Sequence, residues 1–105
     1  MKKDVQKLDI GKAISFYIRP LGNEIRLAIM FILNEKERLS FSEIHDELLK
    51  RGYIVTRAQL AYHLGLLRNS RLISNEFKRE GQIFSRYKLT EIGKKILEGI
   101  EKAIE

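Results

Sequence analysis

The segment with the clearest chemical potential spans residues 55–73 and reads VTRAQLAYHLGLLRNSRLI. Its polar side chains include Arg57, Gln59, Tyr62 and Arg68. An arginine can form two hydrogen bonds with guanine, and a glutamine can do the same with adenine, so these residue types can read base edges in DNA. A helix that only packs would more often carry Glu and Lys on its outer faces. The pattern therefore favours a helix that reads nucleic acid.

Three leucines in this segment recur at helical spacing and predict the face that turns inward, namely Leu60, Leu64 and Leu67. The first turns of such a helix reach base edges in the major groove. Small alanines on the outer face would allow close approach, and their methyl groups can contact thymine. A tyrosine there would bond a phosphate or stack on a sugar. The DNA contacts predicted for helix 56–69 are Thr56, Arg57, Ala58, Gln59, Ala61, Tyr62 and Arg68.

Two further residues of this helix invite explanation. His63 lies beside the leucine stripe, and we expect it to pack at the edge of the core with a hydrogen bond to backbone. Gly65 is unusual because a glycine inside a helix costs about 1 kcal/mol relative to alanine. It would permit the close approach of a phosphate backbone or of another helix, and the sequence leaves both open.

A basic hairpin is predicted directly after this helix, within residues 72–89. Its second half alternates apolar and polar residues, and Gly81 can take the positive φ that a tight turn needs. Basic side chains near the tip would neutralise phosphates or enter the minor groove, which positions a protein but specifies little sequence. The contacts predicted on this wing, residues 76–86, are Lys78, Arg79, Gln82 and Arg86.

The net charge of the 105-residue chain is +6, and its placement is uneven. Residues 51–88 hold eight basic and two acidic side chains, whereas residues 21–50 hold four basic and six acidic ones. A basic block on one part of a small domain is the electrostatic footprint of a polyanion binder. The same charge would also keep a protein soluble. The basic block therefore adds to the evidence of the helix pattern for nucleic-acid binding, but does not establish that binding by itself.

Composition disfavours several other classes of function. The chain has no cysteine, which removes disulfides, thiolate metal sites and cysteine nucleophiles. A transition-metal site needs several convergent ligands, and the histidines are only His45 and His63, so we expect neither a metal nor a cofactor. Paired carboxylates and a glycine-rich phosphate loop are also missing, and we expect no enzyme. Without a membrane-length apolar run or a signal segment, a cytoplasmic protein is expected.

Helix signals divide the first half of the chain. Asp9 can cap a helix over residues 9–19, which should end before Pro20 because the residue preceding a proline disfavours helix. Asn23 can cap a second helix, whose apolar residues occupy most of its circumference. The polar residues 34–38 are expected to break that helix.

The second half continues the pattern. Residues 39–41 are expected to form a very short strand, and Ser42 to cap the next helix. Gly52 is placed to end that helix in the left-handed conformation. After the reading helix and the hairpin, a last helix is predicted over residues 90–105. The whole is one domain, residues 1–105, mainly α with a small β-hairpin wing: a winged helix-turn-helix of about five helices.

Several motifs in this order resemble the ArsR-like family of winged-helix transcription regulators. They are LGNEIRLAIMFIL, FSEIHDELL, LAYHLGLLRNSRLI and YKLTEIGKKIL, and together they span residues 21–97. YHLGLLRNSRLI is similar to the end of the family's recognition helix, and YKLTEIG to its link from the wing to the last helix. The resemblance implies a dimeric DNA-binding repressor. It does not extend to metal sensing, because metal-sensing members use cysteine clusters or histidine and carboxylate ligands on the last helix, and residues 90–105 contain no histidine.

The resemblance and the apolar stripes of the terminal helices together predict a homodimer. Two domains related by symmetry would read an inverted repeat with half-sites about one helical turn, ~34 Å, apart. The competing arrangement folds the last helix back onto the first within one chain. The predicted interface residues are Ile10, Ile14, Tyr17, Ile96, Ile100 and Ile104.

Two non-catalytic alternatives remain open. Winged helices also serve as protein-interaction modules, and the fold alone does not separate the two roles. Leu66 is the apolar residue of the reading helix that would support protein docking. A nonspecific nucleic-acid binder is the other alternative. RNA recognition is less favoured, because the sequence predicts no aromatic-rich sheet on which bases could stack. Neither the operator nor a small-molecule effector is specified by the sequence.

Overall fold

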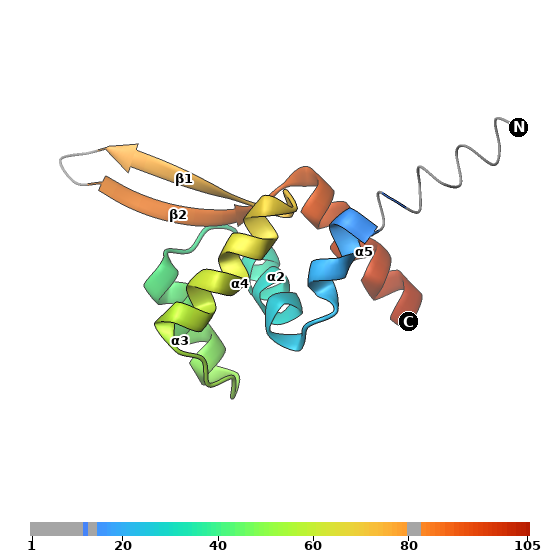
Figure 1. Ribbon diagram of the computed structural model, residues 1–105, viewed down its shortest axis with the longest axis horizontal. Coiled ribbons are helices and arrows are strands. Elements are labelled where there is room, and N and C mark those ends of the chain that lie inside the picture. The colour runs from blue at the N-terminus through green and yellow to red at the C-terminus, as the bar shows by residue number, and fades with distance from the viewer. Residues whose placement is uncertain (1–11, 13–14, 80–82) are drawn as a thin grey trace, which may run out of the picture.

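The protein folds as a helical body with a projecting hairpin, as a computed structural model shows (Figure 1). The structure describes residues 12, 15–79 and 83–105. In chain order, the elements after the first helical residues are η1, α2, α3, α4, β1, β2 and α5. Within the described residues, no helix combines the length and apolar character needed to cross a membrane. The predicted winged helix-turn-helix is confirmed.

The chain enters the body through a helical segment, residues 15–18, that tightens into the 3-10 turn η1, Arg19–Leu21. The α-helical residues therefore end at residue 18, before Pro20, as predicted, and one 3-10 turn continues past the proline. Proline fits there because it occupies an opening position of η1, where a missing N–H leaves no bond unmade. Leu21 then turns into the core.

The central helix is α2, Glu24–Lys36. Asn23 caps it as predicted, since its side-chain oxygen accepts bonds from the N–H groups of Ile25 and Arg26. Its buried residues, Ile29, Met30, Ile32 and Leu33, occupy more than one face, which confirms burial nearly all round. The predicted break at residues 34–38 is confirmed only for residues 37 and 38, because the helix continues as an exposed turn to Lys36. It ends where Glu37 takes a left-handed φ of 67°.

The helix α3, Phe41–Lys50, begins two residues earlier than predicted. Ser40, not Ser42, is its cap: the Ser40 hydroxyl accepts from the N–H of Glu43, whose carboxylate accepts from the N–H of Ser40. The reciprocal bonds satisfy two helix-end donors, whereas Ser42 lies inside the helix. The predicted strand at residues 39–41 reduces to an isolated bridge between Leu39 and Tyr87. Gly52 follows α3 with φ of 90°, as expected.

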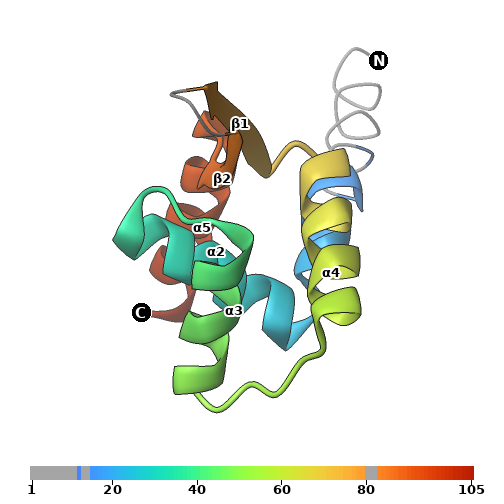
Figure 2. The same ribbon diagram turned by 90° about the vertical axis from the view of Figure 1, so that its left-hand side faces the viewer.

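The helix α4, Arg57–Asn69, follows a short turn and lies beside α3 (Figure 2). It leads into the antiparallel hairpin of β1, Ile73–Arg79, and β2, Ile83–Leu89. The register pairs Ile73 with Leu89 at the base and Arg79 with Ile83 at the outer end. Only the base is anchored in the core, so the outer part of the hairpin projects beyond the helices (Figure 1).

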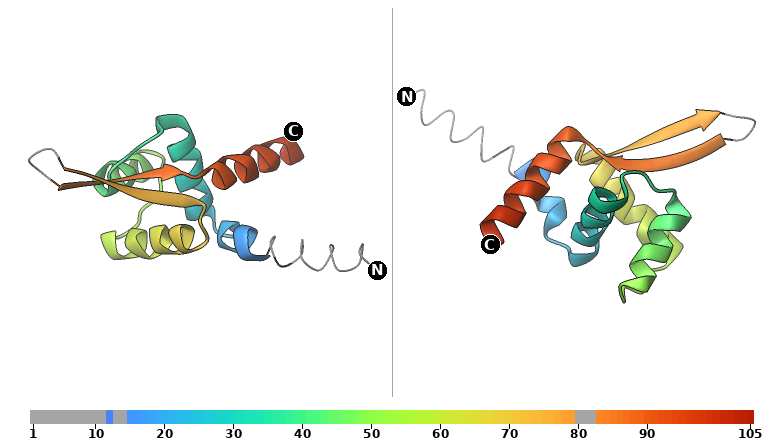
Figure 3. Two further views of the ribbon diagram at one scale, coloured as in Figure 1. Left: turned by 90° about the horizontal axis from the view of Figure 1, so that it is seen from above. Right: turned by 180° about the vertical axis from the view of Figure 1, so that it is seen from behind.

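The last helix, α5, Glu91–Ile104, contacts the body mainly through its first half. Its buried residues are Gly93 and Leu97, and not the isoleucine stripe. Gly93 is required by a close backbone approach, because a Cβ there would lie 2.2 Å from the carbonyl oxygen of Leu72. The second half of α5 extends away from the core (Figure 3).

Candidate nucleic-acid interface

The outer face of α4 is exposed along its length. Leu60, Leu64 and Leu67 are at most 2% exposed, which confirms the predicted inward stripe. With those three anchored in the core, helical geometry turns the opposite side chains to solvent. The predicted contact residues of this helix that are exposed are Thr56, Arg57, Ala58, Gln59, Ala61, Tyr62 and Arg68.

A capping box fixes the N-terminus of α4. The Thr56 hydroxyl accepts a hydrogen bond of 3.0 Å from the N–H of Gln59, and the Gln59 side-chain oxygen accepts one of 2.8 Å from the N–H of Thr56. The first turn is therefore rigid at the point where base edges would be read. The same bond engages the oxygen that Gln59 would need for bidentate contact with adenine, and leaves the amide NH2 group without a hydrogen bond among the described residues.

Arg57 is positioned by an aromatic neighbour. Its guanidinium carbon lies 4.8 Å from the centre of the Phe41 ring, at the start of α3. A cation–π contact of this kind restrains the arginine without neutralising its charge. Within the described residues, neither Arg57 nor Arg68 has a salt-bridge partner. Two charges on the exposed face are thus available to an external anion.

The polar contact beneath this face differs from the one predicted. His63 is 9% exposed, as expected for the core edge, but its Nδ1 faces the Arg26 Nη1 at 3.0 Å instead of a backbone group. Since a guanidinium only donates, Nδ1 accepts and the imidazole is neutral. Burial, and then the neighbouring Arg26 charge, lower the pKa of His63 below its usual value. Arg26 also donates through Nε to the carbonyl oxygen of Pro20, so it ties α4 to the entering chain.

Gly65 has open space around it. No described atom would lie within 4 Å of a Cβ at this position, so no other helix of the same chain requires the glycine. The intrachain explanation for Gly65 is therefore excluded among the described residues, and approach by an external molecule remains.

The described charges of the hairpin interact with neighbouring groups. Glu76 on β1 pairs with Lys88 at 2.6 Å and with Arg38 at 3.5 Å. Arg86 on β2 is exposed, and its charge helps to lower the pKa of Glu43, although the Ser40 cap has the larger effect. Of the other predicted wing contacts, Gln82 lies outside the described residues, as do the side chains of Lys78 and Arg79.

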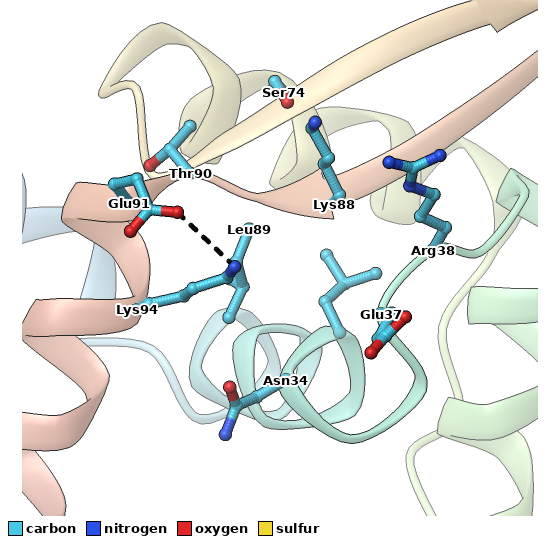
Figure 4. Close-up of a pocket in the computed structure, with 10 residues that line it drawn as sticks. Asn34, Glu37, Arg38, Ser74, Lys88, Leu89, Thr90, Glu91 and Lys94 are labelled. Atoms are coloured by element: carbon cyan, nitrogen blue, oxygen red, sulfur yellow. Dashed lines mark ion pairs between the residues drawn. The ribbon is translucent and has the colours of Figure 1, made fainter.

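A hollow of about 690 Å³ lies behind the hairpin base, between α2 and α5 (Figure 4). Its cations are Arg38, Lys88 and Lys94. Each is within ion-pair distance of a glutamate: Glu76 for the first two, and Glu91 at 3.6 Å for Lys94. These charges are already compensated, so the hollow is a weaker candidate for an anion than the face of α4. No group of metal-ligating side chains occurs in the described parts of the chain.

The residues predicted for the dimer interface differ in how far the structure exposes them. Ile10 and Ile14 lie outside the described residues. Tyr17, Ile96 and Ile100 are partly buried against the core of their own chain, so only part of each side chain is left for a partner. Ile104 is 77% exposed.

Solved structures similar to this chain are transcription regulators. HlyU from Vibrio vulnificus CMCP6 matches with a TM-score of 0.72 and 24% identity over 98% of both chains. A PadR-like transcription factor from Bacteroides fragilis matches with a TM-score of 0.65 and 31% identity, over 74% of this chain and 77% of that one. Bacillus subtilis PadR in complex with operator DNA matches with a TM-score of 0.63 and 23% identity, over 73% of this chain and 46% of PadR.

These neighbours support a winged-helix regulator in general and do not single out the ArsR-like branch. No curated protein matches the sequence. A family model described as a domain of unknown function, DUF7347, matches residues 17–100, which include every element from η1 to most of α5. The chain belongs to the DUF7347 family, and its fold is that of the winged-helix transcription regulators.

Proposed function

We propose that this protein is a sequence-specific regulator that binds double-stranded DNA as a homodimer and acts as a repressor of the ArsR-like type. The observation that carries the proposal is the outer face of α4, where Arg57, Tyr62 and Arg68 are exposed beside a projecting hairpin. An α-helix presented in this way fits the major groove of B-DNA.

Base reading is assigned to the first turn of α4. The capping box and the Phe41 ring hold Arg57 at the edge of the helix, which lowers the entropy lost when its guanidinium binds guanine. Ala58 and Ala61 add no bulk, so the helix backbone can approach the bases. Gln59 contributes one hydrogen bond from its NH2 group while it keeps the cap. Tyr62 contacts a phosphate or sugar.

Phosphate binding is assigned to the flanks of this face. Arg68 and Arg71, at the end of α4, are exposed and lack described salt-bridge partners. The hairpin residues Lys78, Arg79, Gln82 and Arg86 extend the basic strip. Such contacts set the register of the protein on the duplex and release counterions.

Dimerisation is assigned to the terminal helices. α5 and residues 15–21 lie on the side of the body away from the outer ends of β1 and β2 (Figure 1). Ile104 and Ile92, 77% and 40% exposed, continue the partly buried Ile96 and Ile100 into one apolar strip. A two-fold contact there, completed by the first helix with Ile10, Ile14 and Tyr17, leaves both α4 faces free to read an inverted repeat.

The comparisons support the DNA partner by analogy. One neighbour, Bacillus subtilis PadR, was solved with operator DNA, and it matches 73% of this chain. The ArsR-like assignment rests on the motifs YHLGLLRNSRLI and YKLTEIG, which form the end of α4, the turn into β1 and the start of α5.

A protein-docking role is the second candidate, and one observation favours it. Ile54 and Leu49, in the turn before α4 and at the end of α3, are 88% and 54% exposed. Two exposed aliphatic residues offer little apolar surface, whereas an interaction surface typically covers several hundred Å². The charged face of α4 is the larger feature, so DNA is preferred.

Selection from a random duplex library with the purified full chain tests the proposal. We expect enrichment of an inverted repeat and a log–log salt slope of about −4 or steeper, because several phosphates are neutralised in each half-site. The matched control is the double variant Arg57→Ala/Arg68→Ala, which should lose enrichment while it keeps its folded circular dichroism spectrum. Binding that ignores salt, or a library that returns no preferred sequence, would contradict DNA reading.

A further inference from the structure

A second hollow lies between the entering chain and the C-terminal half of α4. Its volume is about 590 Å³, within the range of small-molecule sites. The residues that define its character are Phe16, Arg19, Pro20, Arg26, Tyr62 and Leu66. They come from residues 15–20, from α2 and from α4, and Figure 3 shows the entering chain beside the end of α4.

Among the described residues, no acidic side chain compensates the positive charge of this hollow. Lys12, Arg19 and Arg26 line it, and no carboxylate does so in the described part of the chain. Neither arginine has a described salt-bridge partner. The hollow behind the hairpin is the opposite case, since each of its three cations lies against a glutamate. Two arginines that share a concave wall without a counter-charge favour an anionic ligand.

Arg26 is held so that one end of its guanidinium stays open. Nε donates to the carbonyl oxygen of Pro20, and Nη1 donates to Nδ1 of His63. Nη2 makes no hydrogen bond within the described residues, while the plane of the group is fixed by the other two bonds. A planar donor held in this way suits a carboxylate oxygen, and Arg19 supplies the second guanidinium.

The remaining walls are apolar or aromatic. Phe16 is 48% exposed and Tyr62 64% exposed, although aromatic residues usually bury much of their surface. Pro20 and Leu66 add aliphatic surface. A ligand with a flat apolar body would cover these side chains while its acidic head meets the arginines.

We propose that this hollow binds a small organic monocarboxylate with an aromatic body. The ligand contacts Tyr62, which lies on the same face of α4 that the proposed function assigns to DNA. Bound ligand therefore competes for Tyr62 and weakens DNA binding. Only this last coupling rests on the proposed function, since the binding itself needs no DNA.

The test uses 1-naphthoate as the probe and neutral 1-naphthamide as its uncharged match, titrated into the full chain by calorimetry and by amide NMR shifts. We expect naphthoate to bind with Kd below ~1 mM, and naphthamide on the order of tenfold more weakly, because the charged hydrogen bonds are lost. The shifted amides should cluster at residues 15–20 and at the end of α4.

Matched arginine variants locate the site. Arg19→Gln should weaken the affinity for naphthoate on the order of tenfold. Arg38→Gln, in the hollow behind the hairpin, should leave that affinity unchanged. The Arg19 side chain makes no described hydrogen bond, and its backbone bond to Gly22 is kept in the variant, so the substitution should not unfold the chain. Equal affinity for acid and amide, no binding up to ~10 mM, or equal effects of the two variants would overturn the proposal.

DNA experiments separate this inference from the proposed function. Suppose that naphthoate binds, that Arg19→Gln abolishes naphthoate binding, and that the native chain binds no DNA. The ligand site is then confirmed and the proposed DNA role is wrong. If Arg19→Gln weakens DNA binding but not naphthoate, the arginines serve phosphate and the ligand proposal is wrong. With both correct, saturating naphthoate lowers the DNA affinity of the native chain and not that of Arg19→Gln.

Discussion

The helices α4 and α5 are both amphipathic, but they expose different chemistry. α4 buries Leu60, His63, Leu64 and Leu67 along its length, and presents arginines without described salt-bridge partners. α5 buries only Gly93 and Leu97. Its outer surface combines exposed isoleucines with lysine–glutamate pairs, such as Lys102 and Glu98 at 3.6 Å.

The difference separates two kinds of surface. A firmly anchored helix with uncompensated cations can meet a polyanion without first breaking ion pairs. A helix whose charges are balanced and whose apolar side chains are in excess gains more by covering them with another apolar face. This difference is why we propose α4 as the element that meets DNA and α5 as the element that self-associates.

The largest effect is expected where α5 meets the hairpin base. Gly93→Ala would place a Cβ 2.2 Å from the Leu72 carbonyl oxygen, so the backbone must move, and we expect a loss of about 1–3 kcal/mol in the free energy of unfolding. Gly65→Ala on α4 is the matched control: it meets open space and should stabilise by up to about 1 kcal/mol. Urea unfolding measures both, and equal effects would contradict the close approach.

The next effect concerns the anchored face of α4. Arg57→Ala should reduce discrimination between operator and mutated operator by about 1–3 kcal/mol, because a bidentate base contact is lost. Arg68→Ala, at the far end of the same helix, should weaken all duplexes alike and flatten the salt dependence. Fluorescence anisotropy with matched and scrambled duplexes measures these changes. An identical loss on both duplexes would reassign Arg57 to phosphate.

A smaller effect is expected at the free end of α5. Ile104→Glu should weaken self-association by about tenfold, because a charge would enter the apolar contact between copies. The side chain is 77% exposed, so the monomer fold should survive. Ile54→Glu changes an isoleucine that is 88% exposed but lies before α4, and serves as the control. Sedimentation measures the mass, and an unchanged dimer in Ile104→Glu would refute this interface.

The smallest effect is expected on the pH dependence of stability, through the contact between His63 and Arg26. The pKa of His63 is lowered in the fold, so the unfolded chain binds the proton more readily. Stability is therefore complete above pH ~6.5 and declines as pH falls below it. His63→Gln keeps a hydrogen-bond acceptor for Arg26 and should remove this part of the decline. Urea midpoints between about pH 5 and pH 7.5 measure it, and the same decline in the variant would exclude His63.

The sequence predicts where most helices begin, because a helix cap is formed by residues that are close together in the chain. Asn23, Thr56 and Thr90 cap helices because a side-chain oxygen reaches an N–H two or three residues onward, which is visible in sequence. Ser40 was the exception: a serine stands at both 40 and 42, and the choice depends on Leu39, which the bridge to Tyr87 holds in extended form.

The sequence by itself determined the winged order of elements, the inward leucines of α4 and the basic strip beside it, since these follow from periodicity and charge. Only the tertiary structure decided which side chains are engaged: Gln59 in its cap, Arg57 over Phe41, and Arg26 between Pro20 and His63. The physical reason is distance along the chain. Arg26 and His63 are 37 positions apart, and no local pattern encodes a contact that exists only when α2 and α4 pack together.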